Sequence, residues 1–309
     1  MKGKIFIFIL CLISANVLYA MDSCYADYGL KVKNVLLKDG SKIAYVEKGK
    51  GKTLLFIHGL GGNISHWIKN MDELSKSYRC IAIDLPGYGN SINKNINNED
   101  QLGLYANSII EFAENLRLKK IVLIGHSMGG QIAIITAVQH PAIIKQLILI
   151  APAGLETFTD AERKIFLKFT TPAFFKNQDE ATIRKNFANN FYAQPADAEN
   201  LIEYRVRLKQ CEHFDNYCNV LVNGVKGMLA HPVKNDLNKI QQKVLLVFGE
   251  NDQLIPNRAM HPNITYKDVI EVATKNIKNL QVKVISNAGH MLPFEKPEQL
   301  NYTIKNFVK

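Results

Sequence analysis

The stretch Gly125-His126-Ser127-Met128-Gly129 constrains this chain most, because of the segments on either side of it. A short β-branched, apolar run at 119–124 precedes it, and an apolar helical pattern at 130–138 follows it. A strand, a Gly-x-Ser-x-Gly turn and a helix in this order predict a strained turn that exposes the serine hydroxyl. Glycines suit such a turn because it has little room for larger side chains. Ser127 is therefore the candidate nucleophile.

A serine hydroxyl is a weak nucleophile, so it needs a base whose orientation a third group fixes. In this architecture the chain order is Ser, then Asp or Glu, then His. Asp252 follows a buried-strand pattern at 243–249, and open α/β sheets place their sites just beyond such strand ends. His290 likewise follows the strand pattern at 280–285. We predict Asp252 as the acid and His290 as the base.

Two other residues compete for these roles. Glu250 lies two positions before Asp252 in the same loop and is an alternative acid. His126 neighbours the nucleophile, but adjacent side chains on a sharp turn diverge. Of the eight histidines, His290 is the one that follows both the nucleophile and a late strand.

A glycine-rich loop supplies the candidate oxyanion hole. The strand pattern at 53–57 runs into His58-Gly59-Leu60-Gly61-Gly62. Glycines let backbone N–H groups approach the negative oxygen that forms during acyl transfer, and we expect Leu60 and Met128 to supply them. Phosphate binding is not expected here, because neither Gly-x-Gly-x-x-Gly nor Gly-Lys-Ser/Thr occurs.

The N-terminus has the pattern of a secretory signal peptide. Lys2 and Lys4 precede an uninterrupted apolar run at 5–13, and Ala20 offers a small residue for cleavage. We predict that residues 1–20 are removed and that the protein is exported, to the periplasm or the medium. The apolar run is short for an uncleaved membrane anchor, and Asp22 disfavours lipid attachment at Cys24.

Strand and helix patterns alternate along most of the remaining chain. A hairpin is predicted at 31–47, and helices at 65–78, 99–116, 128–140 and 297–308. This alternation predicts an α/β fold with a mostly parallel sheet and helices on both faces. It is interrupted at 153–235, where the helical patterns are rich in Phe. We expect a core at 28–152 and 236–309, and a separate insertion at 153–235.

Together these motifs resemble the α/β-hydrolase superfamily over about 30–152 and 236–309. The stretch at 84–91 looks like the family's loop after the fourth strand, and Trp67 falls where many members carry an aromatic residue. The secretory start and the glycine-rich loop look most like bacterial serine esterases and lipases of the Moraxella lipase type. Carbon–carbon bond hydrolases of ring-cleavage products have a similar layout. Dehalogenases and epoxide hydrolases would require Asp at position 127.

The resemblance implies a helical cap at 153–235 over the mouth of the site. It also implies a serine hydrolase that cleaves carboxylic esters, small or lipid, through an acyl-enzyme on Ser127. Trp67 and Met291 are expected to border the substrate, and some of the cap's seven phenylalanines should make the pocket apolar, although most should hold the cap together. No cofactor or metal is implied. A carbon–carbon bond hydrolase and a non-catalytic binding protein of this fold are the alternatives.

Charge and cysteine usage add weaker constraints. The formal net charge of +10 comes from scattered lysines, which permit loose attraction to anionic membrane surfaces but form no nucleic-acid-binding motif. Cys80 lies in a strand pattern and is most simply a buried thiol. Cys211 and Cys218 are close in sequence, so we predict a disulfide between them. Neither Cys nor His spacing indicates a zinc site.

Overall fold

The computed structural model describes residues 24–95 and 100–309, which form an α/β fold around one eight-stranded sheet. The strand order is β1-β2-β4-β3-β5-β6-β7-β8. β1 and β2 form an antiparallel hairpin, β2 pairs antiparallel with β4, and all later pairs are parallel. The strands are β1 (Lys33–Leu36), β2 (Lys42–Lys48), β3 (Thr53–Ile57), β4 (Arg79–Ile83), β5 (Ile121–His126), β6 (Ile144–Ile150), β7 (Lys243–Gly249) and β8 (Leu280–Ile285).

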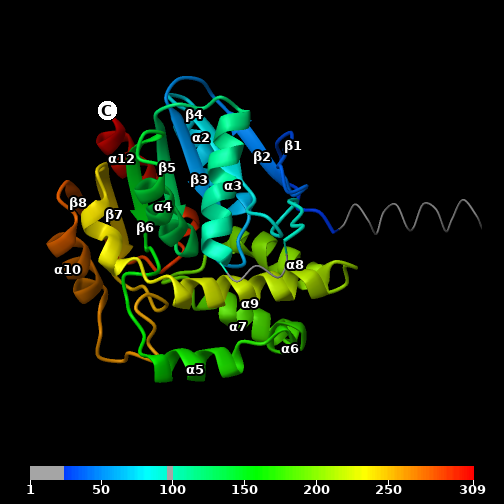
Figure 1. The fold of residues 1–309 in the computed structure, drawn as a ribbon. Helices are drawn as coiled ribbons and strands as arrows, with labels where there is room; N and C mark the ends of the chain where they lie inside the picture. Colours follow the sequence, from blue (N-terminus) through cyan, green and yellow to red (C-terminus); the bar gives the residue numbers. More distant parts are fainter. Residues whose placement is uncertain (1–23, 96–99) are drawn as a thin grey trace, which may run out of the picture.

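Helices cover both faces of the sheet, as predicted (Figure 1). Helices α3 (Gln101–Asn115), α4 (Met128–Gln139) and α10 (Tyr266–Asn276) bury their apolar residues on one face. Helices α2 (Ile68–Leu74) and α12 (Pro297–Val308) cover the other. Successive residues of a strand point to opposite faces, so Leu55 packs in the first layer and Phe56 in the second. The central strands are buried on both sides and therefore read as continuous apolar runs.

Five α-helices lie between β6 and β7 and form the cap below the carboxyl ends of the strands (Figure 1). They are α5 (Asp160–Phe169), α6 (Pro172–Lys176), α7 (Glu180–Ala188), α8 (Glu199–Leu208) and α9 (Phe214–Ala230), with the short 3-10 helix η2 (Ala196–Ala198) before α8. Helix α9 packs against α3, α4, α5 and α6, so it joins the cap to the core. The 3-10 helix η3 (Lys234–Lys239) leads back to β7.

Three helical segments differ from the sequence-based prediction. The segment expected as one helix at 65–78 begins as a 3-10 helix, η1 (Ile64–Trp67), and continues as α2. The Asn63 side chain caps η1 by accepting the Ser65 N–H, which stabilises the tight first turn. The helix α10, between β7 and β8, was not predicted. A short four-residue helix, α11 (Leu292–Glu295), also precedes α12.

The predicted Cys211–Cys218 disulfide is wrong. Cys211 instead bonds to Cys24, 187 positions away, and this bridge ties the N-terminal arm to the cap. Cys218 is a free thiol, 1% exposed, because it lies on α9 and its side chain is part of the core. Nearness in sequence was a poor guide, since a helix directs the Cys218 side chain away from the turn that holds Cys211. Cys80 is a buried free thiol on β4, as predicted.

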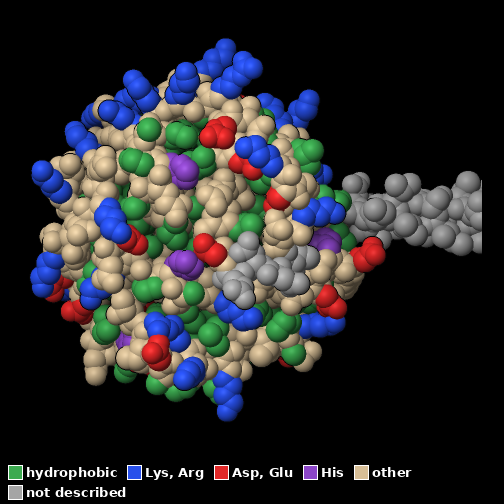
Figure 2. Space-filling model, viewed as in Figure 1, with side chains coloured by type: hydrophobic (Ala, Val, Ile, Leu, Met, Phe, Trp, Pro, Cys, Tyr) green, Lys and Arg blue, Asp and Glu red, His purple; other side chains and the backbone are tan. Residues whose placement is uncertain are grey.

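The surface carries interspersed charges. On the face shown in Figure 2, Lys and Arg side chains are spread around the molecule and do not gather in one patch. The predicted signal peptide at 1–20 lies outside the described residues. Within residues 24–95 and 100–309, no helix has the length and apolar character needed to cross a bilayer.

Candidate active site

Ser127 occupies a strained turn between β5 and α4. Its φ of 56° and ψ of −122° lie in a region that residues with a side chain seldom adopt. Four backbone hydrogen bonds hold it there, one of them from the Gln131 N–H to the Ser127 carbonyl oxygen (3.2 Å). The Ser127 N–H donates to the Ile150 carbonyl (3.0 Å), and its own carbonyl accepts the N–H groups of Gly130 (2.9 Å) and Ala153 (3.0 Å). Such strain persists only where surrounding contacts enforce it, which points to a functional role for the turn.

Glycines are required around this turn because backbone and side chains approach closely. A Cβ on Gly125 would lie 2.2 Å from the Gly129 carbonyl oxygen, and one on Gly129 would lie 2.4 Å from the Ile57 carbonyl oxygen. A Cβ on Gly59 would lie 2.9 Å from the Cβ of Ser127. The glycines of the sequence motif thus let the serine turn pack against the glycine-rich loop after β3.

Asp252 and His290 are brought together from the loops after β7 and β8. The Nδ1 of His290 lies 2.8 Å from Oδ2 of Asp252, and both side chains are almost completely buried. The other carboxylate oxygen, Oδ1, accepts the N–H groups of Leu254 (2.8 Å) and Ile255 (3.0 Å). A carboxylate only accepts, so Nδ1 of His290 carries the proton and Nε2 keeps its lone pair. This is the tautomer that a base for Ser127 requires.

The two competing residues are placed differently. Glu250 is exposed, and none of its described contacts joins its carboxylate to a histidine. His126 lies beneath His290, with ring centroids 4.7 Å apart, and its Nε2 donates to the His290 carbonyl oxygen (2.9 Å). Burial holds the pKa of His126 well below its ordinary value, so its ring stays neutral. His126 therefore supports the backbone of His290.

The glycine-rich loop is held by a buried histidine. His58 donates from Nδ1 to the Gly59 carbonyl oxygen (2.8 Å), and its Nε2 accepts the Leu85 N–H (3.0 Å). Burial lowers the pKa of His58 to about 4, so the neutral ring that makes both contacts is the stable form. Leu60 in this loop borders the same cavity as Ser127, and Met128 is the first residue of α4. The first amides of a helix lack partners within the helix and suit a negative oxygen.

Ser127 and His290 open into a cavity of about 590 Å³ between the core and the cap. Five of the cap's seven phenylalanines line it, more than expected, and Met291 also lines it. They are Phe158, Phe166, Phe169, Phe174 and Phe175. No Lys or Arg occurs among the described residues of the lining. A site of this volume suits a small or medium-sized apolar ligand.

The structure does not place Trp67 where a substrate contact was predicted. Trp67 is not in the cavity wall but is fully buried in the sheet's second layer. Its ring packs against Phe56 (centroids 5.1 Å apart) and His126 (6.5 Å). Trp67 is the last residue of η1, and its side chain faces the strands because η1 packs against β4. Trp67 thus supports the site from below.

A cluster of ionisable side chains beside the cavity was missed by the sequence analysis, and one of them, Glu156, lines it. His261 bonds through Nδ1 to Glu156 and through Nε2 to Glu162 (3.2 Å), and its ring stacks on Phe158. The Glu156 carboxylate also accepts the Asn257 N–H (3.0 Å). Burial lowers the pKa of His261, but the two glutamates outweigh it and raise the pKa above its ordinary value. These residues join the start of the cap to the loop after β7, and no local pattern marks them.

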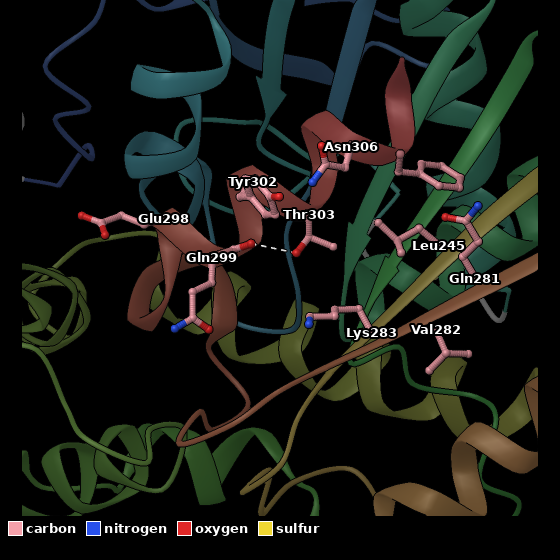
Figure 3. Close-up of a pocket in the computed structure, with 10 residues that line it drawn as sticks. Leu245, Gln281, Val282, Lys283, Glu298, Gln299, Tyr302, Thr303 and Asn306 are labelled. Atoms are coloured by element: carbon pink, nitrogen blue, oxygen red, sulfur yellow. Dashed lines mark hydrogen bonds between the residues drawn. The ribbon is translucent and has the colours of Figure 1, made fainter.

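A second hollow, of about 630 Å³, lies between the edge strand β8 and α12 (Figure 3). Its lining includes Gln281, Lys283 and Tyr302, and the Thr303 hydroxyl donates back to the Gln299 carbonyl of its own helix (2.8 Å). None of the predicted catalytic residues borders this hollow. The two cavities have similar volumes, so volume does not indicate which of them is the active site. The strained Ser127 and the buried His290–Asp252 pair mark the first cavity as the candidate. Within the described ranges, no group of three His, Cys, Asp or Glu side chains is arranged to hold a metal ion.

Comparison with known proteins agrees with this geometry. The chain is 28% identical over 270 residues to the dihydrolipoyllysine-residue acetyltransferase component of the acetoin cleaving system of Cupriavidus necator, covering 86% of this chain but 66% of that protein, just under two thirds. It is 28% identical to putative esterase/lipase 2 of Mycoplasma pneumoniae, covering 84% of this chain and 89% of that one. The crystal structure of a bacterial membrane phospholipase A superposes with a TM-score of 0.76 at 26% identity, covering 100% of this chain and 98% of that one. Residues 52–297 match the family model of the alpha/beta hydrolase fold, and the chain belongs to that family.

Proposed function

We propose that this protein is a serine hydrolase that cleaves carboxylic esters with apolar acyl groups. The observation that carries the proposal is the placement of the strained Ser127 in one Phe-lined cavity with His290, whose ring Asp252 orients. The apolar lining favours a neutral acyl chain. A cavity without Lys or Arg among its described residues offers no partner for a carboxylate or phosphate on the substrate.

The proposed reaction follows from the tautomer of His290. Nε2 of His290 takes the proton of Ser127 while the serine oxygen attacks the ester carbonyl carbon. The N–H groups of Leu60 and Met128 stabilise the negative oxygen that results. His290 then protonates the leaving alcohol, and the acyl group stays on Ser127. A water molecule, deprotonated by His290, releases the acid, and Asp252 stabilises the charged imidazole in both stages.

The acyl chain is proposed to lie among the phenylalanines of α5 and α6. Each methylene buried there contributes about 0.8 kcal/mol, so transition-state binding should improve with chain length until the cavity is full. Ile165 and Phe169 on α5 are 52% and 65% exposed, which gives the cavity an apolar mouth. In Figure 2, apolar and basic side chains are interspersed at the lower edge, where α5 and α6 lie. We propose that this mouth meets anionic lipid surfaces.

A panel of p-nitrophenyl esters of increasing chain length tests the substrate class. We expect kcat/KM to rise from acetyl to hexanoyl or octanoyl esters, and Ser127→Ala to abolish activity without unfolding the protein. Acetyl esters giving the highest kcat/KM would contradict the apolar pocket. A strong preference for a carboxylate-bearing diketone over every simple ester would instead establish the carbon–carbon bond hydrolase alternative.

We also propose that the protein is exported after removal of residues 1–20. The basic and apolar pattern of the N-terminus supports this, and the Cys24–Cys211 disulfide is consistent with an oxidising compartment. N-terminal sequencing of the protein purified from cell fractions tests the proposal. A mature chain that begins at Met1 in the cytoplasmic fraction would contradict it.

A further inference from the structure

A buried carboxylate next to the candidate base has no place in the reaction described above. Glu295, the last residue of α11, is 9% exposed and accepts hydrogen bonds from three backbone N–H groups. Its Oε2 accepts the N–H of Gly289 (2.7 Å), the residue directly before His290. Its Oε1 accepts the N–H groups of Tyr192 (3.0 Å) and Ala193 (2.7 Å). One side chain thus binds two separate segments of backbone.

The two segments belong to different parts of the molecule. Gly289 lies in the loop after β8 that carries His290, whereas Tyr192 and Ala193 lie in the cap between α7 and η2. The segments also touch directly, because a Cβ on Gly289 would lie 2.7 Å from the Tyr192 nitrogen. The Met291 N–H donates to the Asn190 carbonyl oxygen (2.8 Å), and Asn190 itself borders the cavity.

A small apolar cluster completes this junction. It combines side chains of the loop and α11 with side chains of the cap: Met291, Phe294, Phe191, Ala198 and Leu201. The loop that carries His290 is therefore packed between the sheet and the cap, and the Glu295 carboxylate lies at the centre of its polar contacts.

We propose that Glu295 is a positioning residue that fixes both the position of His290 and the position of the cap against the core. This inference rests on the proposed function of His290. Asp252 orients the imidazole ring, and Glu295 fixes the backbone from which that ring projects. Proton transfer from Ser127 depends on both, because a displacement of about 1 Å in an active site can cost roughly 10²-fold in rate.

A carboxylate is needed at this position because all three partners are donors. Glutamine has one acceptor oxygen and one NH2 group, so in Glu295→Gln the NH2 group must face Gly289 or the cap N–H groups. Facing Gly289 leaves one N–H without an acceptor, whereas facing the cap leaves two. The NH2 group is therefore expected at Gly289, and the loop that carries His290 is released. Glu295→Asp keeps both acceptor oxygens but is one methylene shorter, so it should support the junction only in part.

The test compares Glu295→Gln and Glu295→Asp with Glu298→Gln, a matched change of an exposed glutamate three residues away. kcat and KM are measured for p-nitrophenyl acetate and octanoate. We expect Glu295→Gln to lower kcat for both esters by the same factor, about 10²-fold, because proton transfer is common to both. Glu295→Asp should fall between Glu295→Gln and wild type, and Glu298→Gln should match wild type.

Hydrogen exchange supplies a readout that needs no substrate. In Glu295→Gln, the amides of 289–292 should exchange faster than in wild type, while those of β5 should not change. This readout remains valid if wild type hydrolyses no ester, a result that would refute the proposed function alone. If Glu295→Gln is unfolded by circular dichroism, the same comparisons are made with Glu295→Asp.

Two results would overturn the inference. Unchanged kcat and unchanged exchange in both Glu295 variants would show that the carboxylate holds neither segment. A higher KM for the octanoate with normal kcat for both esters would show that Glu295 supports the cap but does not position His290.

Discussion

The most discriminating prediction concerns Asp252→Asn. Oδ1 of Asp252 accepts two backbone N–H groups, so the oxygen of the new amide should take that position. The NH2 group then replaces Oδ2 and faces Nδ1 of His290. Two donors cannot bond, so the imidazole proton moves to Nε2 and Nδ1 becomes the acceptor. His290 keeps its place but has lost the lone pair that should take the proton of Ser127.

The expected loss is large because the wrong tautomer dominates. In serine proteases the corresponding change lowers kcat by about 10⁴-fold, which is about 5.4 kcal/mol at about 1.36 kcal/mol per factor of ten. Stability should change much less, since both hydrogen bonds to Leu254 and Ile255 are kept. We therefore expect nearly inactive protein with an unfolding midpoint close to that of wild type.

The assay is hydrolysis of p-nitrophenyl butyrate by wild type, Asp252→Asn and Glu250→Gln, with thermal unfolding of each followed by circular dichroism. Glu250→Gln is the matched control because Glu250 is an exposed acid of the same loop. Its kcat should stay within a factor of about two of wild type, since surface changes away from a site cost little. A kcat of Asp252→Asn within tenfold of the wild-type kcat would refute the assignment of Asp252 as the acid. Inactivity of Glu250→Gln would refute it as well.

Three further predictions follow from particular contacts. Cys24→Ser should lower the free energy of unfolding by up to about 5 kcal/mol, the loop-closure value for a bridge of this span, whereas Cys218→Ser should leave the bridge intact in non-reducing peptide maps. The pKa of His261 is raised in the folded protein, so its ion pairs stabilise the fold fully below the ordinary pKa of 6.5, and this contribution is lost as pH rises through the folded-state pKa. The difference in unfolding midpoint between wild type and His261→Gln should therefore shrink above the folded-state pKa. A constant difference from pH 5 to 9 would contradict this. Phe169→Asp should weaken co-sedimentation with phosphatidylglycerol vesicles relative to wild type, and equal binding would place the lipid contact elsewhere.

The fold and the order of the site residues could be read from local patterns. Buried parallel strands appear as continuous apolar runs, and the serine turn has glycines at both ends. Ser127 could therefore be predicted as the candidate nucleophile from its neighbours alone. Asp252 and His290 could be predicted because each follows a strand, and the carboxyl ends of parallel strands meet at one edge of the sheet.

Local patterns could not place residues whose partners are far away in the chain. Trp67 has the same sequence context whether it faces the cavity or the sheet, and only the packing of η1 on the strands decides that it is buried. Cys211 has a nearby cysteine and a distant one, and the fold brings the distant Cys24 within reach.

The supporting carboxylates show the same limit. Glu295 and Glu156 look like ordinary surface acids in the sequence, yet the first binds backbone N–H groups of the cap and the second binds His261. Backbone N–H groups carry no side-chain signature, so their partners become visible only when loops from different strands are assembled. Local sequence patterns predict the chemistry proposed for this chain. Which side chains hold the reacting groups in place depends on the assembled fold, because those contacts join segments that are far apart in the chain.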